Sequence, residues 1–254
     1  MHRQLLFSSV ITTVMMLSFS QISMAQAPVN LSVSVGGGLL LPQSSNLRGD
    51  MYSAYDYPLS KTGYDLGGKI RLGLPLSPLA FIGTVSYNSL SDNEVIPVAL
   101  ESGGSVNSRY KTALSIVSAG LGVEYPLLPI PVFKPYIGAD ATMNFISGST
   151  KYQFDTSPET KLNSTGPTSR FGLNLDVGTL IEIPFLPFSL DLEAKYQFAN
   201  LLGKTNKNNA LPGFIVPLIF QSNLDDAKNP YDPKDHDRSI NYFTFGLGFK
   251  FNIL

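Results

Sequence analysis

The last fifteen residues, 240–254, alternate between two kinds of side chain. Phenylalanine and aliphatic residues hold one set of alternate positions, whereas tyrosine, threonine, glycine, lysine and asparagine hold the other. Successive side chains leave a pleated backbone on opposite sides, so this period of two predicts a β-strand with one apolar face. A helix would mix the two sets on every face.

The same alternation recurs along most of the chain. We expect further strands over residues 29–41, 64–74, about 80–89, about 110–125, about 133–147, about 169–183 and 189–198. The breaks after the second, fourth and sixth strands are short and contain proline, which ends a strand cleanly, and the other breaks are long and polar. Short turns at one end and long loops at the other are typical of an outer-membrane barrel with both termini in the periplasm. The sequence therefore predicts an all-β, eight-stranded antiparallel up-and-down transmembrane β-barrel.

Composition narrows the function classes. The chain has a formal net charge of -1, 15% charged residues, 22 glycines and no cysteine. Near-neutral charge does not favour a nucleic-acid binder, and the absence of thiols excludes disulfides and thiolate metal sites. We expect no cofactor.

The N-terminal residues resemble an export signal. A basic start precedes an apolar run over residues 5–17 and a small-residue cleavage site. We expect a signal peptide over residues 1–25, with cleavage after residue 27 as the alternative, and a barrel domain over residues 28–254. No other segment approaches the roughly 18 to 20 apolar residues of a membrane helix.

Alternation alone does not show which face of the strands is inside, because a soluble lipocalin-like barrel also alternates. A soluble barrel would present a polar outer face rich in lysine, glutamate and threonine, whereas the polar face here is rich in glycine with isolated charges of both signs. Opposite charges facing each other across a narrow lumen can pair, which makes their burial tolerable. Our candidates for lumen ion pairs are Lys69, Arg71, Glu124, Asp140, Asp176, Glu182, Asp191, Glu193, Lys195 and Lys250.

The apolar face supplies a lipid belt with aromatic residues near both ends. We place one group toward the loops and a second toward the turns: Tyr64, Tyr87, Phe171, Phe198 and Phe243, and then Phe81, Tyr125, Phe249 and Phe251.

Three stretches give the chain a family resemblance. Residues 134–139 follow a proline-rich turn, residues 171–174 read Phe-Gly-Leu-Asn, and residues 245–251 form the closing aromatic strand. In this order, they resemble the small bacterial outer-membrane β-barrels of the outer-membrane protein A and X types. The resemblance implies a monomer in outer-membrane lipid, and recognition of the last strand by the barrel-assembly machinery. The chain departs from the family by ending on residues 252–254 rather than on an aromatic residue, so Phe251 is the expected cue.

The last long connection holds the other candidate features. His236 is the one histidine after the signal and suggests a lipid- or peptide-hydrolysing enzyme only weakly, because no nucleophile motif accompanies it. Asp232, Asp235 and Asp237 make a weak metal site, since lysine and arginine are interleaved with them. An apolar stretch over residues 213–220 offers loop interaction candidates or an extra hairpin that would make ten strands: Phe214, Ile215, Leu218 and Phe220.

From these observations we expect a non-enzymatic outer-membrane barrel with a side-chain-filled lumen and a structural or surface-interaction role. The alternative is a narrow, porin-like channel for small solutes. A barrel hydrolase is the least favoured interpretation.

Overall fold

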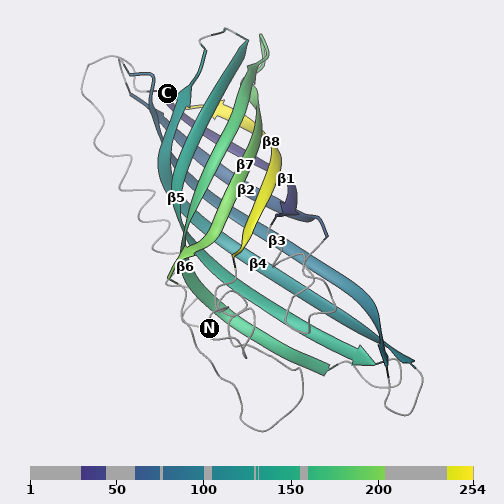
Figure 1. Cartoon of the computed structure of the whole chain (residues 1–254). Helices are drawn as coiled ribbons and strands as arrows, with labels where there is room; N and C mark the ends of the chain where they lie inside the picture. Colours follow the sequence, from purple (N-terminus) through teal and green to yellow (C-terminus); the bar gives the residue numbers. More distant parts are fainter. Residues whose placement is uncertain are drawn as a thin grey trace, which may run out of the picture.

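The computed structural model describes residues 30–43, 61–74, 77–99, 105–128, 130, 132–154, 160–203 and 239–253. In this part of the chain, every regular element is a strand, and the eight strands form one closed antiparallel barrel in chain order (Figure 1). The predicted fold class is confirmed. The strands are β1 (Asn30–Pro42), β2 (Gly63–Gly73), β3 (Ala80–Ala99), β4 (Ser105–Pro126), β5 (Phe133–Phe154), β6 (Thr160–Glu182), β7 (Phe188–Leu202) and β8 (Asn241–Asn252).

Closure depends on β1, which pairs with β2 on one side and with β8 on the other. The β1–β8 ladder runs from Ser32 opposite Asn252 to Pro42 opposite Tyr242. Both ends of the wall, Asn30 and Asn252, therefore lie at the end where the short turns join β2 to β3, β4 to β5 and β6 to β7.

Apolar side chains point outward and charged side chains point inward, as in a membrane barrel. A soluble barrel has the opposite arrangement. Outward positions are apolar and exposed, for example Leu121 at 77% and Val85 at 61%, while inward Lys69 and Arg71 are only 6% and 4% exposed. Aromatic pairs lie at both ends of the outer face, Tyr64 with Tyr87 toward the loops and Phe188 with Phe249 toward the turns. The closed sheet pairs the backbone polar groups with one another without water, as a bilayer requires. The apolar exterior is the surface that contacts lipid.

Four strands continue into stretches that the sequence predicted to be long loops. Residues 90–99, 105–109, 148–154 and 160–168 were expected to be polar loops, but they continue β3, β4, β5 and β6. Beyond Ser89 the β3 strand has only β4 as a ladder partner among the described residues, and beyond Phe171 the β6 strand has only β5. These four extensions and the residues that pair with them form a sheet that projects past the rest of the barrel (Figure 1). We call residues 90–99, 105–115, 147–154 and 160–170 the projecting sheet.

The wrong loop prediction has a physical cause. Outside the bilayer both faces of a strand can be polar, so the apolar alternation that identified the spanning segments is weak there. Pro97 and Pro167 also look like strand breakers in the sequence. They are tolerated because β3 and β6 are the edges of the projecting sheet, and Pro167 lies at a shift in the β5–β6 register.

Several expectations fall outside the described residues: the signal peptide, the stretch 213–220 with its possible extra hairpin, His236, and Asp232, Asp235 and Asp237. In the described ranges no helix is long and apolar enough to cross a bilayer.

The turn between β6 and β7 holds an unusual backbone. Phe185 has φ 74° and is fully exposed, and the amide of Leu186 donates to the carbonyl of Ile183 at 3.2 Å. A left-handed conformation crowds the Cβ of an L-residue, so glycine is the usual occupant of such a position. Phe185 therefore carries local strain without the compensation of packing against the protein.

We expect the variant Phe185→Gly to be more stable than the wild type by about 1 kcal/mol, because glycine removes the Cβ clash. Urea unfolding in lipid vesicles measures this change. Leu186→Gly is the matched control: its backbone φ is not positive, so it should give no gain. A loss of stability in Phe185→Gly would show that the ring contributes a favourable contact with the membrane interface.

Candidate functional site in the barrel lumen

Tyr136 is the centre of a polar network that fills the turn half of the lumen. It projects inward from β5 and is 1% exposed. Its hydroxyl donates to Asp191 Oδ1 at 2.7 Å, with Glu193 Oε2 at 3.1 Å, and the Lys69 and Arg71 cations lie 5.2 and 5.3 Å from its ring centre. The ring thus lies close to two cations, and its hydroxyl lies within hydrogen-bond distance of two carboxylates.

Arg71 makes the most extensive set of contacts. Its Nε donates to both carboxylate oxygens of Glu124 at 2.9 Å, and its Nη2 donates to Asp191 Oδ2 at 2.7 Å. Its Nη1 also donates to the hydroxyl of Ser34. The planar guanidinium therefore links β1, β2, β4 and β7 across the lumen, which a lysine could not do with the same geometry.

Lys69 and Lys195 form the second group of ion pairs. Lys69 Nζ donates to Asp176 Oδ2 at 2.9 Å and to Glu193, and it lies 3.5 Å from Glu124. Lys195 Nζ lies 2.8 Å from the other oxygen of Glu193. Glu193 thus bridges the two lysines, and Lys69 connects this group to that of Arg71.

The network contains more carboxylate than cation. Asp140 is 1% exposed and accepts from Thr84 and Asn174, both at 3.0 Å, rather than from a cation. One oxygen each of Asp65, Asp140 and Asp176 is buried without a hydrogen-bond partner. Buried carboxylates of this kind depend on the positive charge of Lys69, Arg71 and Lys195 nearby.

The structure brings seven of the ten candidates into mutual ion pairs: Lys69, Arg71, Glu124, Asp176, Asp191, Glu193 and Lys195. Asp140 lies beside them as described. Glu182 pairs instead with Lys134 at 2.7 Å, and both side chains are partly exposed at the turn end. Lys250 faces the lumen at 8% exposure, and none of the ion pairs between described residues includes it.

Glycines give the large side chains their room. A methyl group at Gly178 would overlap the hydroxyl end of Tyr136, and one at Gly138 would lie 2.5 Å from Asp176 Oδ1. Gly178 is the neighbour of Tyr136 on β6, and Gly138 is the neighbour of Asp176 on β5. The glycine-rich alternate positions in the sequence are thus the spaces into which the network folds.

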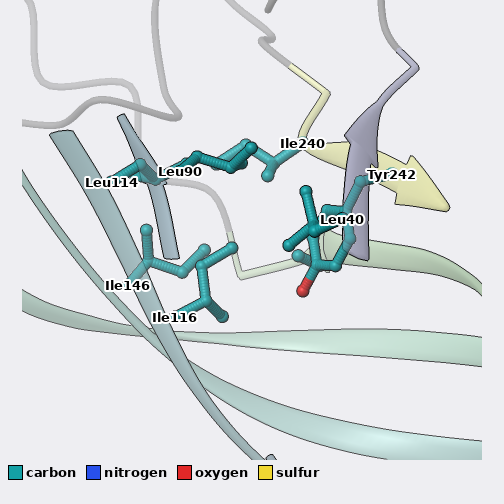
Figure 2. Packing of buried hydrophobic residues seen from close by; sticks show 8 residues of the cluster. Leu40, Leu90, Leu114, Ile116, Ile146, Ile240 and Tyr242 are labelled. Carbon is teal, nitrogen blue, oxygen red and sulfur yellow. The ribbon is translucent and has the colours of Figure 1, made fainter. Parts of the chain in front are cut away.

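Toward the loop end, the lumen changes from charged to neutral and then to apolar. Tyr242 donates to Gln197 at 3.2 Å, and the Asn144 amide donates to the carbonyl of Ala199 at 2.7 Å. Next to them lies a buried apolar cluster from six strands and the segment before β8, shown in Figure 2: Leu40, Leu90, Leu114, Ile116, Ile146, Ala199, Ile240 and Tyr242. The lumen therefore contains an ion-pair layer and, nearer the loops, an apolar layer.

A small cavity lies beside the ion pairs. Its volume is about 70 Å³, and Asp65, Lys69, Glu193 and Lys195 line it together with glycines of β1, β2 and β8. The described residues contain no group of three or more histidine, cysteine or acidic side chains placed to hold a metal ion. The arrangement suits charge neutralisation and rigid packing.

The sequence analysis did not name Tyr136 and Asp65 as site residues, and it did not predict the apolar layer. Tyr136 could have been found, because an inward aromatic residue needs a small neighbour and Gly178 follows the same inward pattern on the next strand. The apolar layer gave no such signal, because Leu90, Leu114 and Ile116 lie on the inward side at the point where the outer face becomes polar.

Removing the central cation tests the network. We expect Arg71→Met to lower the free energy of unfolding in lipid vesicles by about 3 to 5 kcal/mol, because Glu124 and Asp191 would lose their partner in a dry lumen. Adding Glu124→Gln should restore part of the loss. Lys134→Met, which breaks the partly exposed pair with Glu182, is the matched control and should cost about 1 kcal/mol or less. Equal losses in Arg71→Met and Lys134→Met would contradict a dry, coupled network.

No protein-family model and no curated protein matches this chain. Among solved structures, the chain is similar to Neisserial surface protein A (NspA), with 14% identity and a TM-score of 0.47, over 88% of this chain and 97% of that chain. It is also similar to Ail, the attachment invasion locus protein of Yersinia pestis, solved with the heparin analogue sucrose octasulfate, with 13% identity and a TM-score of 0.39, over 89% of this chain and 100% of that chain.

Proposed function

We propose that this chain is a non-conducting barrel of the bacterial outer membrane that acts at the cell surface through the projecting sheet. Its termini are periplasmic, and the barrel itself is a monomeric anchor. The observation that carries the proposal is the length of β3 to β6. Residues 90–99 of β3 alone continue the strand by about 30 Å at 3.4 Å per residue, past the last ladder contact with β2.

The projecting sheet is not needed to cross the bilayer. The spanning parts of β1, β2, β7 and β8 have 13, 11, 15 and 12 residues, which meets the roughly 9 to 11 that a tilted strand requires. The extensions add ordered, hydrogen-bonded surface beyond that requirement. An ordered sheet outside the membrane is a platform for recognition, since binding residues are often placed on a rigid scaffold.

The filled lumen supports the non-conducting part of the proposal. Lys69, Arg71 and Tyr136 cross the turn half, and the apolar cluster around Ile116 and Tyr242 lies across the loop half. Ion pairs occupy the space that a water path would use, and an apolar constriction resists wetting.

The second candidate, a narrow channel for small solutes, is favoured by the cavity beside Lys69 and Lys195. It would require the apolar layer to open.

Two partners complete the proposal. Outer-membrane lipid contacts the apolar belt, and the barrel-assembly machinery reads β8 through Phe251, which is 42% exposed on the outer face.

Planar-bilayer conductance separates the two candidates. We expect no steady current from the purified wild-type protein, because both layers of the lumen are packed. Heat-modifiable mobility on a gel of the same sample shows that the barrel is folded, so that an absent current is not mistaken for absent protein. A steady open current would favour the channel.

Cysteine labelling tests the orientation, and the chain helps because it contains no cysteine. Asn107→Cys places a thiol at an exposed position of the projecting sheet, and Leu128→Cys places one on an exposed turn at the other end. A polymer-linked maleimide too large to cross the outer membrane should label Asn107→Cys in intact cells and label Leu128→Cys only after permeabilisation. The reverse pattern would overturn the proposed orientation.

A further inference from the structure

Lys250 is a buried cation at the turn end of the lumen, which lies opposite the projecting sheet (Figure 1). Its side chain faces inward from β8 and is 8% exposed. Two other lysines are buried in the described lumen, Lys69 and Lys195, and both contact the carboxylate of Glu193. Lys250 differs from them, because it has neither an ion pair nor a side-chain hydrogen bond among the described residues. A buried charge without a partner is unfavourable, so this position favours an anion.

The carboxylates at this end of the lumen are held by other cations. Lys134 and Arg71 together pair with three of them: Glu124, Glu182 and Asp191. None of the three lies within ion-pair distance of Lys250. Direct contact within the described part of the wall therefore does not neutralise the Lys250 ammonium group.

Two serine hydroxyls flank Lys250 on the inward face. Ser34 lies opposite Lys250 on β1 and Ser189 lies opposite it on β7, and these serines are 5% and 6% exposed. Neighbouring strands are about 4.8 Å apart, so the three residues form a short row across the wall. Ser34 accepts a hydrogen bond from Arg71 and keeps its own hydroxyl hydrogen to donate. Within the described residues the hydroxyl of Ser189 has no partner, so the row is a set of donors without an acceptor.

A cavity of about 470 Å³ adjoins this row. It lies beside the turn between β6 and β7, and Ser189 and Asn252 are part of its lining. Asn252 is the next inward residue after Lys250 on β8. Neither the Nζ atom of Lys250 nor the Oγ atom of Ser189 is fully buried. A small ligand can therefore reach both groups from the mouth of the barrel.

The same cavity extends to the lipid-facing rim. Val132, Ile183 and Phe188 line it on that side, and the first two are 51% and 38% exposed. Glu182 also lines the cavity, where Lys134 neutralises it. The cavity thus joins a polar mouth to the apolar belt. It suits the headgroup of a lipid as well as a free anion, and a phosphate group is the chemistry that both can supply.

We propose that Lys250, Ser34 and Ser189 bind a phosphate group at the turn-side mouth of the barrel. The ammonium group has three donor hydrogens and each serine adds one, which matches the several acceptor oxygens of a phosphate. Arg71, in contact with Ser34, places a second positive charge beside the site. The inference goes beyond the proposed function and rests on it in one respect, namely that the turn end faces the periplasm.

The test uses the purified, folded protein in maltoside micelles, which contain no phosphate. Inorganic phosphate is added at constant ionic strength set with chloride, and the backbone amides are followed by NMR spectroscopy. We expect saturable shifts at the amides of Ser34, Ser189 and Lys250. The amide of Ala199, which lies in the apolar layer at the loop half, should not shift.

Variants show which side chains hold the anion. We expect K250M to bind inorganic phosphate about tenfold more weakly than the wild type, which corresponds to about 1.4 kcal/mol. K61M is the matched control: it also removes one lysine, from the pair with Asp92 near the loops, and should bind like the wild type. K250R keeps the charge and should retain most of the affinity. Heat-modifiable mobility verifies that each variant is folded.

S189A provides a second test that leaves every charge in place. It removes one neutral donor and should weaken binding about threefold. This variant decides the question if K250M does not fold. Equal affinities of S189A, K250M and the wild type, shifts confined to the loop half, or equal shifts with chloride alone would each overturn the inference.

The source of the phosphate is tested by adding lysophosphatidylglycerol to the same micelles. A lipid-borne phosphate should shift the same amides at a lower concentration than inorganic phosphate does, because the lipid chain adds contacts at the apolar rim. A response to inorganic phosphate alone would assign the site to a free anion. A response to neither probe would overturn the inference.

Failure of the proposed function would look different. Labelling of Leu128→Cys in intact cells would place the turn end outside the cell, whatever the phosphate titration shows. Labelling of Leu128→Cys only after permeabilisation, together with equal affinities of K250M and the wild type, would refute only the phosphate site.

Discussion

The pairing of β1 with β8 is the constraint on which the rest of the structure depends. In hydrocarbon, an open edge would leave a row of backbone donors and acceptors without partners, at several kcal/mol each. Once the edge is closed, each strand has one face toward lipid and one toward a narrow interior. The inward residues must then satisfy one another. The contacts of Tyr136, Arg71 and Lys69 follow from that confinement.

The inward side chains are accommodated differently in the two halves of the lumen. Near the turns, cations from β2 and β7 neutralise carboxylates from β4, β6 and β7, with Tyr136 between them. Near the loops, apolar residues from six strands and the segment before β8 pack together, and the buried Asp92 pairs with Lys61 at 2.6 Å. The turn half of the lumen is filled by ion pairs and the loop half by apolar side chains. The projecting sheet is therefore the part of the described wall that is available for contacts outside the bilayer.

The sequence predicted the barrel well because lipid demands a strict alternation that few other environments require. The seam between the first and last strands, the inward position of Lys69 and the outward position of Phe249 all follow from it. Outside the bilayer, that demand ends. The extensions of β3 to β6 are rich in serine and contain proline, so they lack the alternation of apolar and polar residues that identified the spanning strands. The ion-pair partners were harder to predict, because pairing across the lumen depends on register and height. Arg71 and Asp191 are 120 positions apart in the chain, and Lys250 found no ion pair among the described residues although it faces inward.

The glycines of the closing seam have a consequence for how the barrel reaches its final form. Gly36 lies opposite Gly248 and Gly38 opposite Gly246, and a methyl group at Gly38 would overlap the backbone of β8. At these four positions the inward side of the ladder has no side chains, and the inward pairs that flank them are Ser34 with Lys250 and Leu40 with Thr244. In the middle of this ladder, the side chains that distinguish one register from another are therefore the outward pairs, Val35 with Phe249 and Leu39 with Phe245. Contacts on the lipid-facing surface thus contribute to the register in which β1 pairs with β8. The membrane therefore takes part in selecting the register of the ladder that it surrounds.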